Sequence, residues 1–218
     1  MIKRGEAWGS PTASSPDAVV TGGDAALAAA ASATPGALFR FEPDATSDLA
    51  RAVGVLPGGS RVETRYAVAL DALRLADGSL ACNMCVVGLA PDRLRWSSNA
   101  SALDVVVDGR PWYSGPATTV VIATGQYLRG LDLVPRGHPG DHRAEIHVYA
   151  LHRSERHAMR SRLPAGSHVP HPRIKTGSGR HVAVTAARPL PVEVDGAPRE
   201  RASEVVVEVV ADAYRLLL

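Results

Sequence analysis

The sequence contains few aromatic residues, two cysteines, two lysines and no long apolar run. Because aromatic residues make up only 5% of the 218 residues, the hydrophobic core must be formed mainly by Val, Leu and Ala. No apolar segment approaches the about 20 residues that a membrane-spanning helix needs, and residues 1–15 lack the apolar region of a secretory signal. We therefore expect a globular, cytoplasmic protein.

With Lys3 and Lys175 as the only lysines, cationic contacts to a phosphate would have to come from arginine. The formal net charge is +2, but residues 136–181 hold nine Lys/Arg, three Asp/Glu and all eight histidines. This segment predicts a basic surface that attracts phosphate groups or an anionic membrane, more strongly at mildly acidic pH. A solvated basic face without a partner is the alternative, and no nucleic-acid partner is expected.

Cys82 and Cys85 form one CxxC motif within residues 80–88, which have the pattern of a β-strand. Side chains three residues apart in a strand point to opposite faces, so the two thiols are poorly placed to share a zinc ion. We therefore expect two buried cysteines that pack as small apolar side chains, and we assign no metal ligands.

The first part of the chain contains two successive strand–turn–helix patterns. A short β-run over residues 16–22 precedes the alanine-rich residues 25–33, which favour a helix. A strand over residues 37–41 and a helix over residues 48–54 repeat the pattern. Two such units predict a small parallel sheet.

The remaining chain alternates apolar and polar residues with period two, interrupted by Gly and Pro. Residues 65–75 and 80–89 are expected to pair as a hairpin, and residues 181–195 and 203–210 are expected to be strands on either side of a turn at Asp195-Gly196. Short strands at regular spacing predict an antiparallel β-sandwich.

The predicted fold class is therefore α/β plus β, with a reduced βα lobe in residues 1–60 and a larger β-sandwich-like domain in residues 61–218. Residues 56–60 would form the linker. Two parallel strands are too few for independent stability, so the lobe must pack on the β-domain or on a second copy in a homodimer.

Four short motifs carry a family resemblance. They are Gly22-Gly23-Asp24, residues 43–54 (PDATSDLARAVG), the turn Thr124-Gly125-Gln126-Tyr127 and residues 188–196 (RPLPVEVDG). Together they resemble the diacylglycerol kinase-like lipid kinases of the NAD kinase superfamily. The resemblance implies a cleft between a nucleotide-binding lobe and a β-domain, with ATP and Mg²⁺ as cofactors and a lipid alcohol as substrate.

The chain departs from that family at the residues used for phosphotransfer. Ala25 and Ala26 replace a glycine and a hydroxyl residue of the phosphate turn, Ala45 and Ser47 depart from the second turn, and Ala197 occupies the position of the candidate catalytic Glu. Only about twenty residues precede Gly22 in this sequence, so the resemblance leads us to expect that most of the family's nucleotide-binding lobe is missing. We expect that phosphotransfer has been lost.

The residues that could still bind a nucleotide lie in the two turns. A glycine-rich turn before a helix binds phosphate through its free N–H groups and the positive helix end. The candidate cofactor-binding residues are Gly22, Gly23, Asp24, Thr46 and Asp48. Either Thr46 or Ser47 would cap the second helix.

Three carboxylates are considered for catalysis. Asp24 could be a metal ligand or a charge partner, or could simply cap a helix. Glu200 follows Pro198 on an expected flexible turn, where it would be a general base for the acceptor hydroxyl. Glu193 alternates with valines and is expected to point outward from the sheet.

Four histidines in loops are further candidates for catalysis or metal binding. His138 and His142 could form an acid–base pair or a metal site, as could His168 and His171. The simpler interpretation is that all four are exposed loop residues.

Three functions follow. The first is a lipid-kinase-like protein that has lost phosphotransfer and binds a small or lipid-like ligand in its cleft. The second is an active ATP-dependent lipid kinase with substituted motifs, and the third is an enzyme of different chemistry on the same fold.

Overall fold

Two βα units form a small lobe, as the sequence predicts. The computed structural model describes residues 9–55 and 66–218. The lobe contains, in chain order, β2 (Ala18–Gly22), α1 (Asp24–Ala33), β3 (Leu38–Pro43) and α2 (Asp48–Val53). Ser47, and not Thr46, is the N-cap of α2, because the Ser47 hydroxyl accepts a hydrogen bond from the Ala50 N–H at 3.0 Å.

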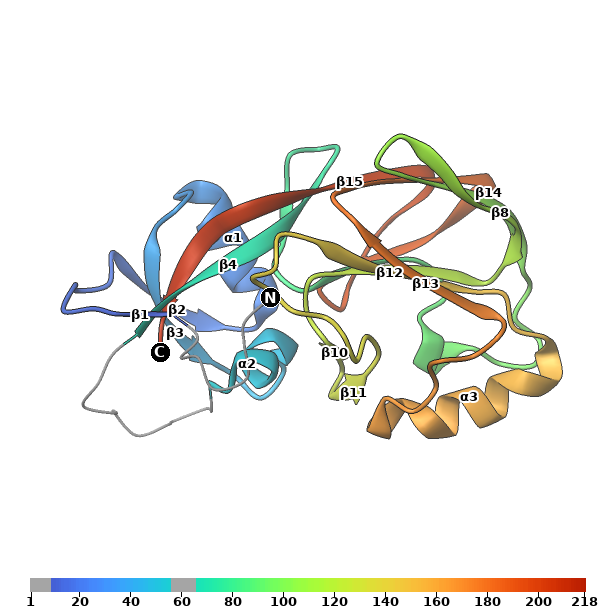
Figure 1. The fold of residues 1–218 in the computed structure, drawn as a ribbon, viewed down its shortest axis with the longest axis horizontal. Helices are drawn as coiled ribbons and strands as arrows, with labels where there is room; N and C mark the ends of the chain where they lie inside the picture. Colours follow the sequence, from blue (N-terminus) through green and yellow to red (C-terminus); the bar gives the residue numbers. More distant parts are fainter. Residues whose placement is uncertain (1–8, 56–65) are drawn as a thin grey trace.

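The lobe is completed by a strand from far along the chain. β2 pairs in parallel with β3, and β3 pairs in parallel with the last residues of β15 (Ala197–Leu217). Figure 1 shows β15 crossing from the β-rich part of the molecule to the lobe, where the C-terminus lies next to β2 and β3. β15 thus supplies the third strand that a stable sheet requires. The predicted boundary after residue 60 and the linker at residues 56–60 lie outside the described residues.

The rest of the chain is a mostly antiparallel β-domain. The main sheet runs β1-β4-β15-β14-β6-β9-β12-β13, and β7 and β8 extend it from β14. The strand bounds are β1 Ser10–Pro11, β4 Tyr66–Leu75, β5 Leu80–Ala81, β6 Met84–Gly88, β7 Ser101–Val107, β8 Arg110–Ala117, β9 Thr119–Ala123, β10 Tyr127–Leu128, β11 Leu131–Asp132, β12 Ala144–Tyr149, β13 Ile174–Gly179 and β14 His181–Val194. The predicted fold class is confirmed.

The predicted hairpin of residues 65–75 and 80–89 is wrong in its second half. β4 pairs with β5 over two residue pairs, whereas β6 pairs with β9 and β14. The change of partner occurs at residues 82–84, whose three backbone N–H groups donate to the carboxylate of Asp195 at 2.8–3.0 Å. Those donors are therefore lost to the β4 ladder.

Strands β6 and β9 are buried on both faces, because successive side chains enter two different cores. Cys85 and Ile122 face a core shared with β7, β12 and β14, whereas Met84 and Val121 face a second core that includes Met159 of α3 (Arg156–Arg162). The 3₁₀ turns are Pro91–Arg93, Arg153–Glu155 and Leu163–Ala165. In the described ranges, no helix is long and apolar enough to cross a membrane.

The two cysteines are free and buried, as predicted. Cys82 packs in the core of the βα lobe, together with side chains of α1, α2 and β3, while Cys85 packs in the β-domain. Burial raises the pKa of both thiols. The two side chains therefore act as small apolar groups in separate cores.

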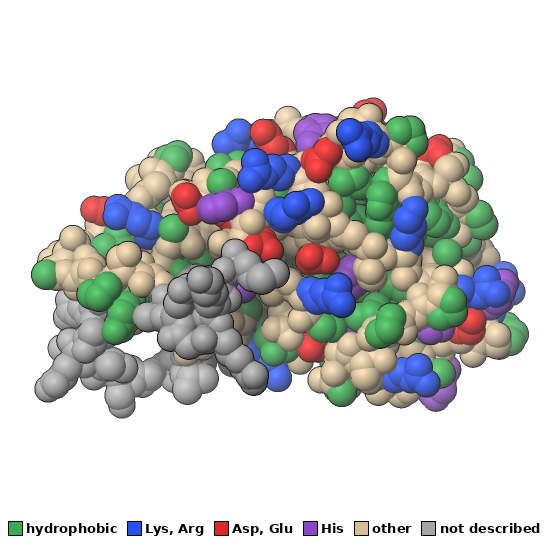
Figure 2. Space-filling view, viewed as in Figure 1, with side chains coloured by type: hydrophobic (Ala, Val, Ile, Leu, Met, Phe, Trp, Pro, Cys, Tyr) green, Lys and Arg blue, Asp and Glu red, His purple; other side chains and the backbone are tan. Residues whose placement is uncertain are grey.

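A buried cluster of His147, Tyr149 and His168 contradicts the expectation that His168 is exposed. Histidines are visible on the face drawn in Figure 2, but His147 is 2% and His168 1% exposed. His168 Nε2 lies 3.2 Å from the Tyr149 hydroxyl and 3.1 Å from the Leu133 carbonyl oxygen. The Nδ1 atoms of both histidines have no hydrogen-bond partner among the described residues. Burial, helped by His168 and Arg136, lowers the pKa of His147 to about 4.

The Leu216→Ala variant tests how far the lobe depends on β15. Leu216 is fully buried and pairs with Phe39 of β3, so truncation should lower the free energy of unfolding by about 2–5 kcal/mol and speed hydrogen exchange in β2 and β3. The control is Leu217→Ala, at the half-buried neighbouring residue, which should lower the free energy of unfolding by less. Denaturant unfolding and hydrogen-exchange mass spectrometry measure both effects. Unchanged protection of β2 and β3 in Leu216→Ala would contradict the dependence.

The buried His147 predicts a loss of stability in mild acid. The unfolded chain protonates a histidine near pH 6.5, whereas native His147 stays neutral to about pH 4, so the unfolded state binds the extra proton and the free energy of unfolding falls as pH drops through this window. The slope is about 1.4 kcal/mol per pH unit for one proton. His147→Phe should remove this part of the slope, measured by urea unfolding at a series of pH values. Identical slopes in both proteins would refute the prediction.

Candidate functional site

The two βα turns lie side by side at the carboxyl ends of β2 and β3. Gly22 has φ of +118°, a backbone conformation that residues with a Cβ rarely adopt. A Cβ on Gly23 would lie 3.0 Å from Thr46 Oγ1 and 3.8 Å from the carboxylate of Asp44, so the second turn packs directly on the first. Parallel strands meet at this edge, and it is where a ligand of an α/β sheet is expected.

Asp24 joins the lobe to the β-domain instead of capping its own helix. Its carboxylate accepts hydrogen bonds from the Ser47 hydroxyl at 2.5 Å, from the Leu49 N–H at 3.1 Å and from Asn83 Nδ2 at 3.3 Å. The Asn83 amide also donates to the Tyr127 carbonyl at 2.8 Å. Burial raises the pKa of Asp24 to about 6, against the opposing effect of the Ser47 and Leu49 hydrogen bonds.

Thr46 and Asp48, the other predicted cofactor-binding residues, have protein partners. The Thr46 N–H and hydroxyl both donate to Asp44 Oδ1, at 2.7 and 2.6 Å, and these bonds hold the pKa of Asp44 below its usual value. Asp48 accepts the backbone N–H groups of Arg129 and Gly130 at 2.5 and 2.7 Å. The carboxylates of the second turn therefore accept hydrogen bonds from within the protein.

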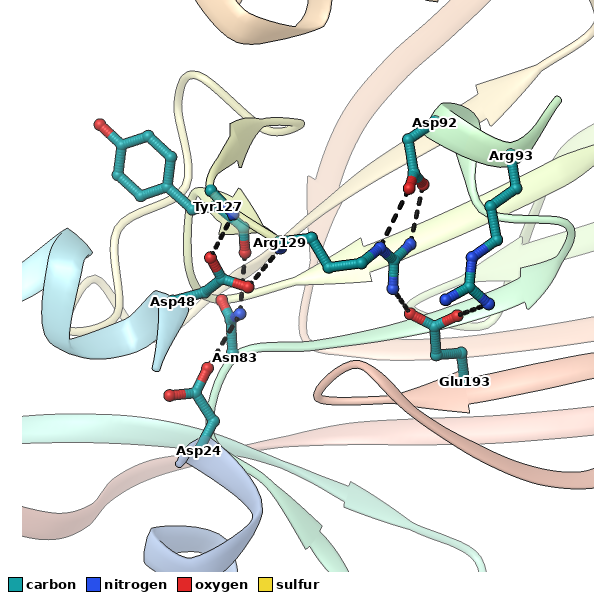
Figure 3. A network of polar contacts seen from close by, with 9 residues as sticks. Asp24, Asp48, Asn83, Asp92, Arg93, Tyr127, Arg129 and Glu193 are labelled. Carbon is teal, nitrogen blue, oxygen red and sulfur yellow. Dashed lines mark hydrogen bonds and ion pairs between the residues drawn. The ribbon is translucent and has the colours of Figure 1, made fainter. Parts of the chain in front are cut away.

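A second group of charged residues continues from Asp48 across the β-domain (Figure 3). Arg129, with φ of +52°, donates Nε and Nη2 to Asp92 at 3.0 and 2.7 Å and Nη1 to Glu193. Arg93 donates to the other oxygen of Glu193 at 3.2 Å. Backbone strain of this kind in a non-glycine residue is found often at functional sites. Here the N–H of Arg129 binds Asp48 while its guanidinium binds both acids.

Glu193 corrects the expectation that it points to solvent. Its side chain is 9% exposed, because it lies opposite Val86 of β6 on a face that Arg93 and Arg129 cover. Sequence analysis missed Arg93, Arg129, Asp92 and Asn83. Their partners are distant along the chain, and no local spacing marks them.

Asp195 fixes the turn between β14 and β15. It has φ of +48° and accepts the N–H groups of Cys82, Asn83 and Met84. Burial is the main cause that raises the pKa of Asp195 to about 7, and nearby Asp24 acts in the same direction. This aspartate is engaged on both oxygens by the backbone.

A cavity of about 340 Å³ lies beside this turn, between α1 and the β14–β15 hairpin. Its lining is mostly small and apolar, with one cation. The lining residues are Ala25, Ala28, Ala29, Ser32, Ser79, Leu80, Val194, Asp195, Ala197, Pro198 and Arg199. Ala25 and Ala197, at two positions where the sequence departs from the kinase-like pattern, thus share one hollow between the lobe and the β-domain.

The other predicted catalytic residues lie elsewhere. Glu200 is within β15, not on a flexible turn, and lines a different cavity of about 480 Å³. His142 Nδ1 lies 3.1 Å from Asp71 Oδ1, and the His142 N–H donates to Asp71 Oδ2 at 2.6 Å. His138 Nδ1 accepts the Gly140 N–H at 3.3 Å. Asp24, Glu200 and His142 thus have separate surroundings and form no common catalytic site.

One group of residues has the composition of a metal site. Ligand atoms of Asp71, His142 and Asp212 lie within 4.8 Å of one another. Asp71 is fully buried and also accepts the Asp212 N–H at 3.0 Å. Both of its oxygens are therefore already used to hold residues 142 and 212 in place.

Comparison with known proteins identifies the fold. Residues 62–218 match the YegS C-terminal NAD kinase beta sandwich-like domain. No curated protein sequence matches the chain. A diacylglycerol kinase structure from Bacillus anthracis str. Sterne superposes with a TM-score of 0.72 at 15% identity, covering 92% of this chain and 77% of that one. A structure of a candidate diacylglycerol kinase from the same strain gives a TM-score of 0.75 at 15% identity with the same coverage.

An NAD kinase from Archaeoglobus fulgidus, in complex with ATP, has a TM-score of 0.50 at 13% identity and covers 93% of this chain and 77% of that one. These structural likenesses concern the fold alone. The domain match, in contrast, spans most of the chain. The chain therefore belongs to the family of the YegS C-terminal NAD kinase beta sandwich-like domain, within the diacylglycerol kinase-like and NAD kinase superfamily.

Proposed function

We propose that this protein binds a small or lipid-like ligand in the cavity between α1 and the β14–β15 hairpin, and that it does not transfer phosphate from ATP. The observation that carries the proposal is the lining of the cavity. Ala25 and Ala197 meet there, at the positions where the family resemblance expects a phosphate-turn glycine and a catalytic glutamate. At Ala197 a methyl group stands in place of the expected carboxylate, and at Ala25 a methyl group is added where the resemblance expects none.

No other carboxylate in the lining replaces the missing base. Asp195 is the acid nearest to Ala197, but its oxygens accept three backbone N–H groups. Its raised pKa would suit a base, but both oxygens are directed at backbone donors, and a general base needs an oxygen within hydrogen-bond reach of the substrate hydroxyl. Glu200 belongs to the separate cavity.

Mg²⁺ and ATP do not fit the turn residues that are present. The carboxylate of Asp44, kept ionised by Thr46, lies next to Gly23, where the resemblance places phosphate groups. A negative charge here disfavours a bound phosphate, although solvent weakens the repulsion because Asp44 is exposed. Asp24 and Asp48 are occupied by protein donors, so they are not free to bind a neutralising cation.

The cavity suits a ligand with an apolar body and a polar end. Its volume of about 340 Å³ is at the lower end of small-molecule sites. The alanines of α1 give an apolar wall, while Arg199 supplies a cation at the hairpin. Histidine lines neither this cavity nor the 480 Å³ one, which speaks against the alternative of histidine-based chemistry.

Purified protein should not incorporate phosphate from radiolabelled ATP into diacylglycerol or sphingosine in the presence of Mg²⁺. A general base alone contributes roughly 10²–10⁴ in rate, and Ala197→Glu combined with Ala25→Gly and Ala26→Thr should restore little, because the carboxylate of Asp44 remains. Robust turnover that a folded Asp24→Asn variant abolishes would replace this proposal by the active-kinase alternative.

Two alanines of α1 give a matched pair for testing the ligand site. Ala26 and Ala29 are both exposed, but only Ala29 lines the cavity. Ala29→Phe should fill the space and weaken binding of a fluorescent monoacylglycerol at least about tenfold, whereas Ala26→Phe should leave it unchanged. Fluorescence titration measures the affinity, and thermal unfolding confirms that both variants fold. Equal binding by the two variants, or none by the wild type, would reject the ligand site.

A further inference from the structure

A loop on the β-domain is held in place by three arginines of the neighbouring helical segment. Arg153, Arg156 and Arg160 are spaced so that they share one side of that segment, and all three reach residues 94–99. Arg156 Nη1 donates to the carbonyl oxygens of residues 95, 96 and 98 at 2.9, 3.2 and 2.6 Å. Arg160 donates to the Leu94 carbonyl at 2.9 Å, and Arg153 to Asn99 Oδ1 at 3.3 Å.

This clamp holds Trp96 at the surface. The Trp96 side chain is 65% exposed, and in the described ranges it is the most exposed large apolar residue. The adjacent Leu94 is fully buried, and the turn between Arg95 and Ser98 is closed by hydrogen bonds of 3.0 and 3.1 Å. The loop is anchored on both sides of the tryptophan, so the backbone that carries the exposed indole is held in place.

The charge around Trp96 is positive and is not neutralised. Arg156 itself is buried and serves as the anchor of the loop. We call the side chains of Arg95, Trp96, Arg153 and Arg160 the Trp96 patch. In the described part of the chain, none of its three arginines forms an ion pair with a carboxylate. The nearby Glu155 pairs with Arg173 instead. Figure 2 shows Lys or Arg next to His side chains at the lower right, the end where Figure 1 places α3.

We propose that the Trp96 patch docks on the surface of an anionic lipid membrane. Tryptophan is favoured at the membrane–water interface, because its ring is apolar and its N–H is polar. Arginine side chains reach phosphate groups while their stems stay on apolar surface. An anionic leaflet attracts basic residues near its surface, and the patch presents three arginines beside one exposed indole ring.

Two other occupants fit the patch less well. A second copy of the chain would bring two unneutralised basic patches together, which like-charge repulsion opposes. A single-stranded nucleic acid is held by several aromatic side chains in a basic groove, whereas the patch has one exposed aromatic ring. None of the patch residues lines either cavity. Membrane docking is therefore independent of the proposed ligand site.

Cosedimentation with vesicles tests the proposal. The full chain should bind vesicles of phosphatidylglycerol and phosphatidylcholine at low salt, bind less at high salt, and not bind phosphatidylcholine alone. Arg95→Glu, a change of two charges, and Trp96→Ser should each weaken partitioning roughly tenfold or more. The controls are Arg188→Glu and Val19→Ser, which make the same kinds of change at exposed positions outside the patch. They should have less effect than the two patch variants.

A second measurement locates the tryptophan. In a variant with Trp8→Phe and Trp112→Phe, Trp96 is the only indole. Its fluorescence should shift to the blue on anionic vesicles and be quenched by brominated lipids. Absence of vesicle binding at low salt, equal loss in patch and control variants, or binding of an oligonucleotide but not of vesicles would each overturn the proposal.

Discussion

The contact between the βα lobe and the β-domain depends on the carboxylate of Asp195. By accepting three successive N–H groups it holds residues 82–84 in a bend, and this bend places Asn83 between Asp24 and the Tyr127 carbonyl. Without the carboxylate, three N–H groups would lose their partner together, and each buried unpaired group costs about 1–3 kcal/mol. This structural role accounts for an aspartate in the turn without reference to catalysis.

The parts of the fold that the sequence predicts are those with local causes. The alanine run acts within α1, and Ser47 and Gly54 act at the two ends of α2. Each helix can therefore be predicted from a short stretch of sequence. The burial of the two CxxC cysteines was also predicted correctly, but the reason differs: Cys82 lies in the bend between β5 and β6, so the turn of the chain, and not strand alternation, sends the two side chains into separate cores. The same periodicity could not show that β6 would leave the β4 hairpin, since the competing acceptor, Asp195, is remote in the chain.

The candidate site was less accessible to sequence reasoning, because its interactions join distant residues. The alternation around Glu193 is real, but a polar residue on the outer face of a strand is exposed only if nothing covers that face. Here Arg93 and Arg129 cover it. Similarly, a Pro- and Gly-rich loop suggested an exposed His168, and tertiary packing against Tyr149 buried it. Ala25 and Ala197, in contrast, were identified from short motifs, and the structure places both on one cavity.

The parallel pairing of β3 with the end of β15 also constrains the order of folding. Residues 38–39 pair with residues 215–216, so the sheet of the βα lobe cannot be completed until nearly all of the described chain that follows β3 has been synthesised. Such long-range closure slows folding and leaves the edge of β3 unpaired in the meantime. Chaperone dependence during synthesis would then be concentrated in the N-terminal lobe, although the β-domain contains most of the strands.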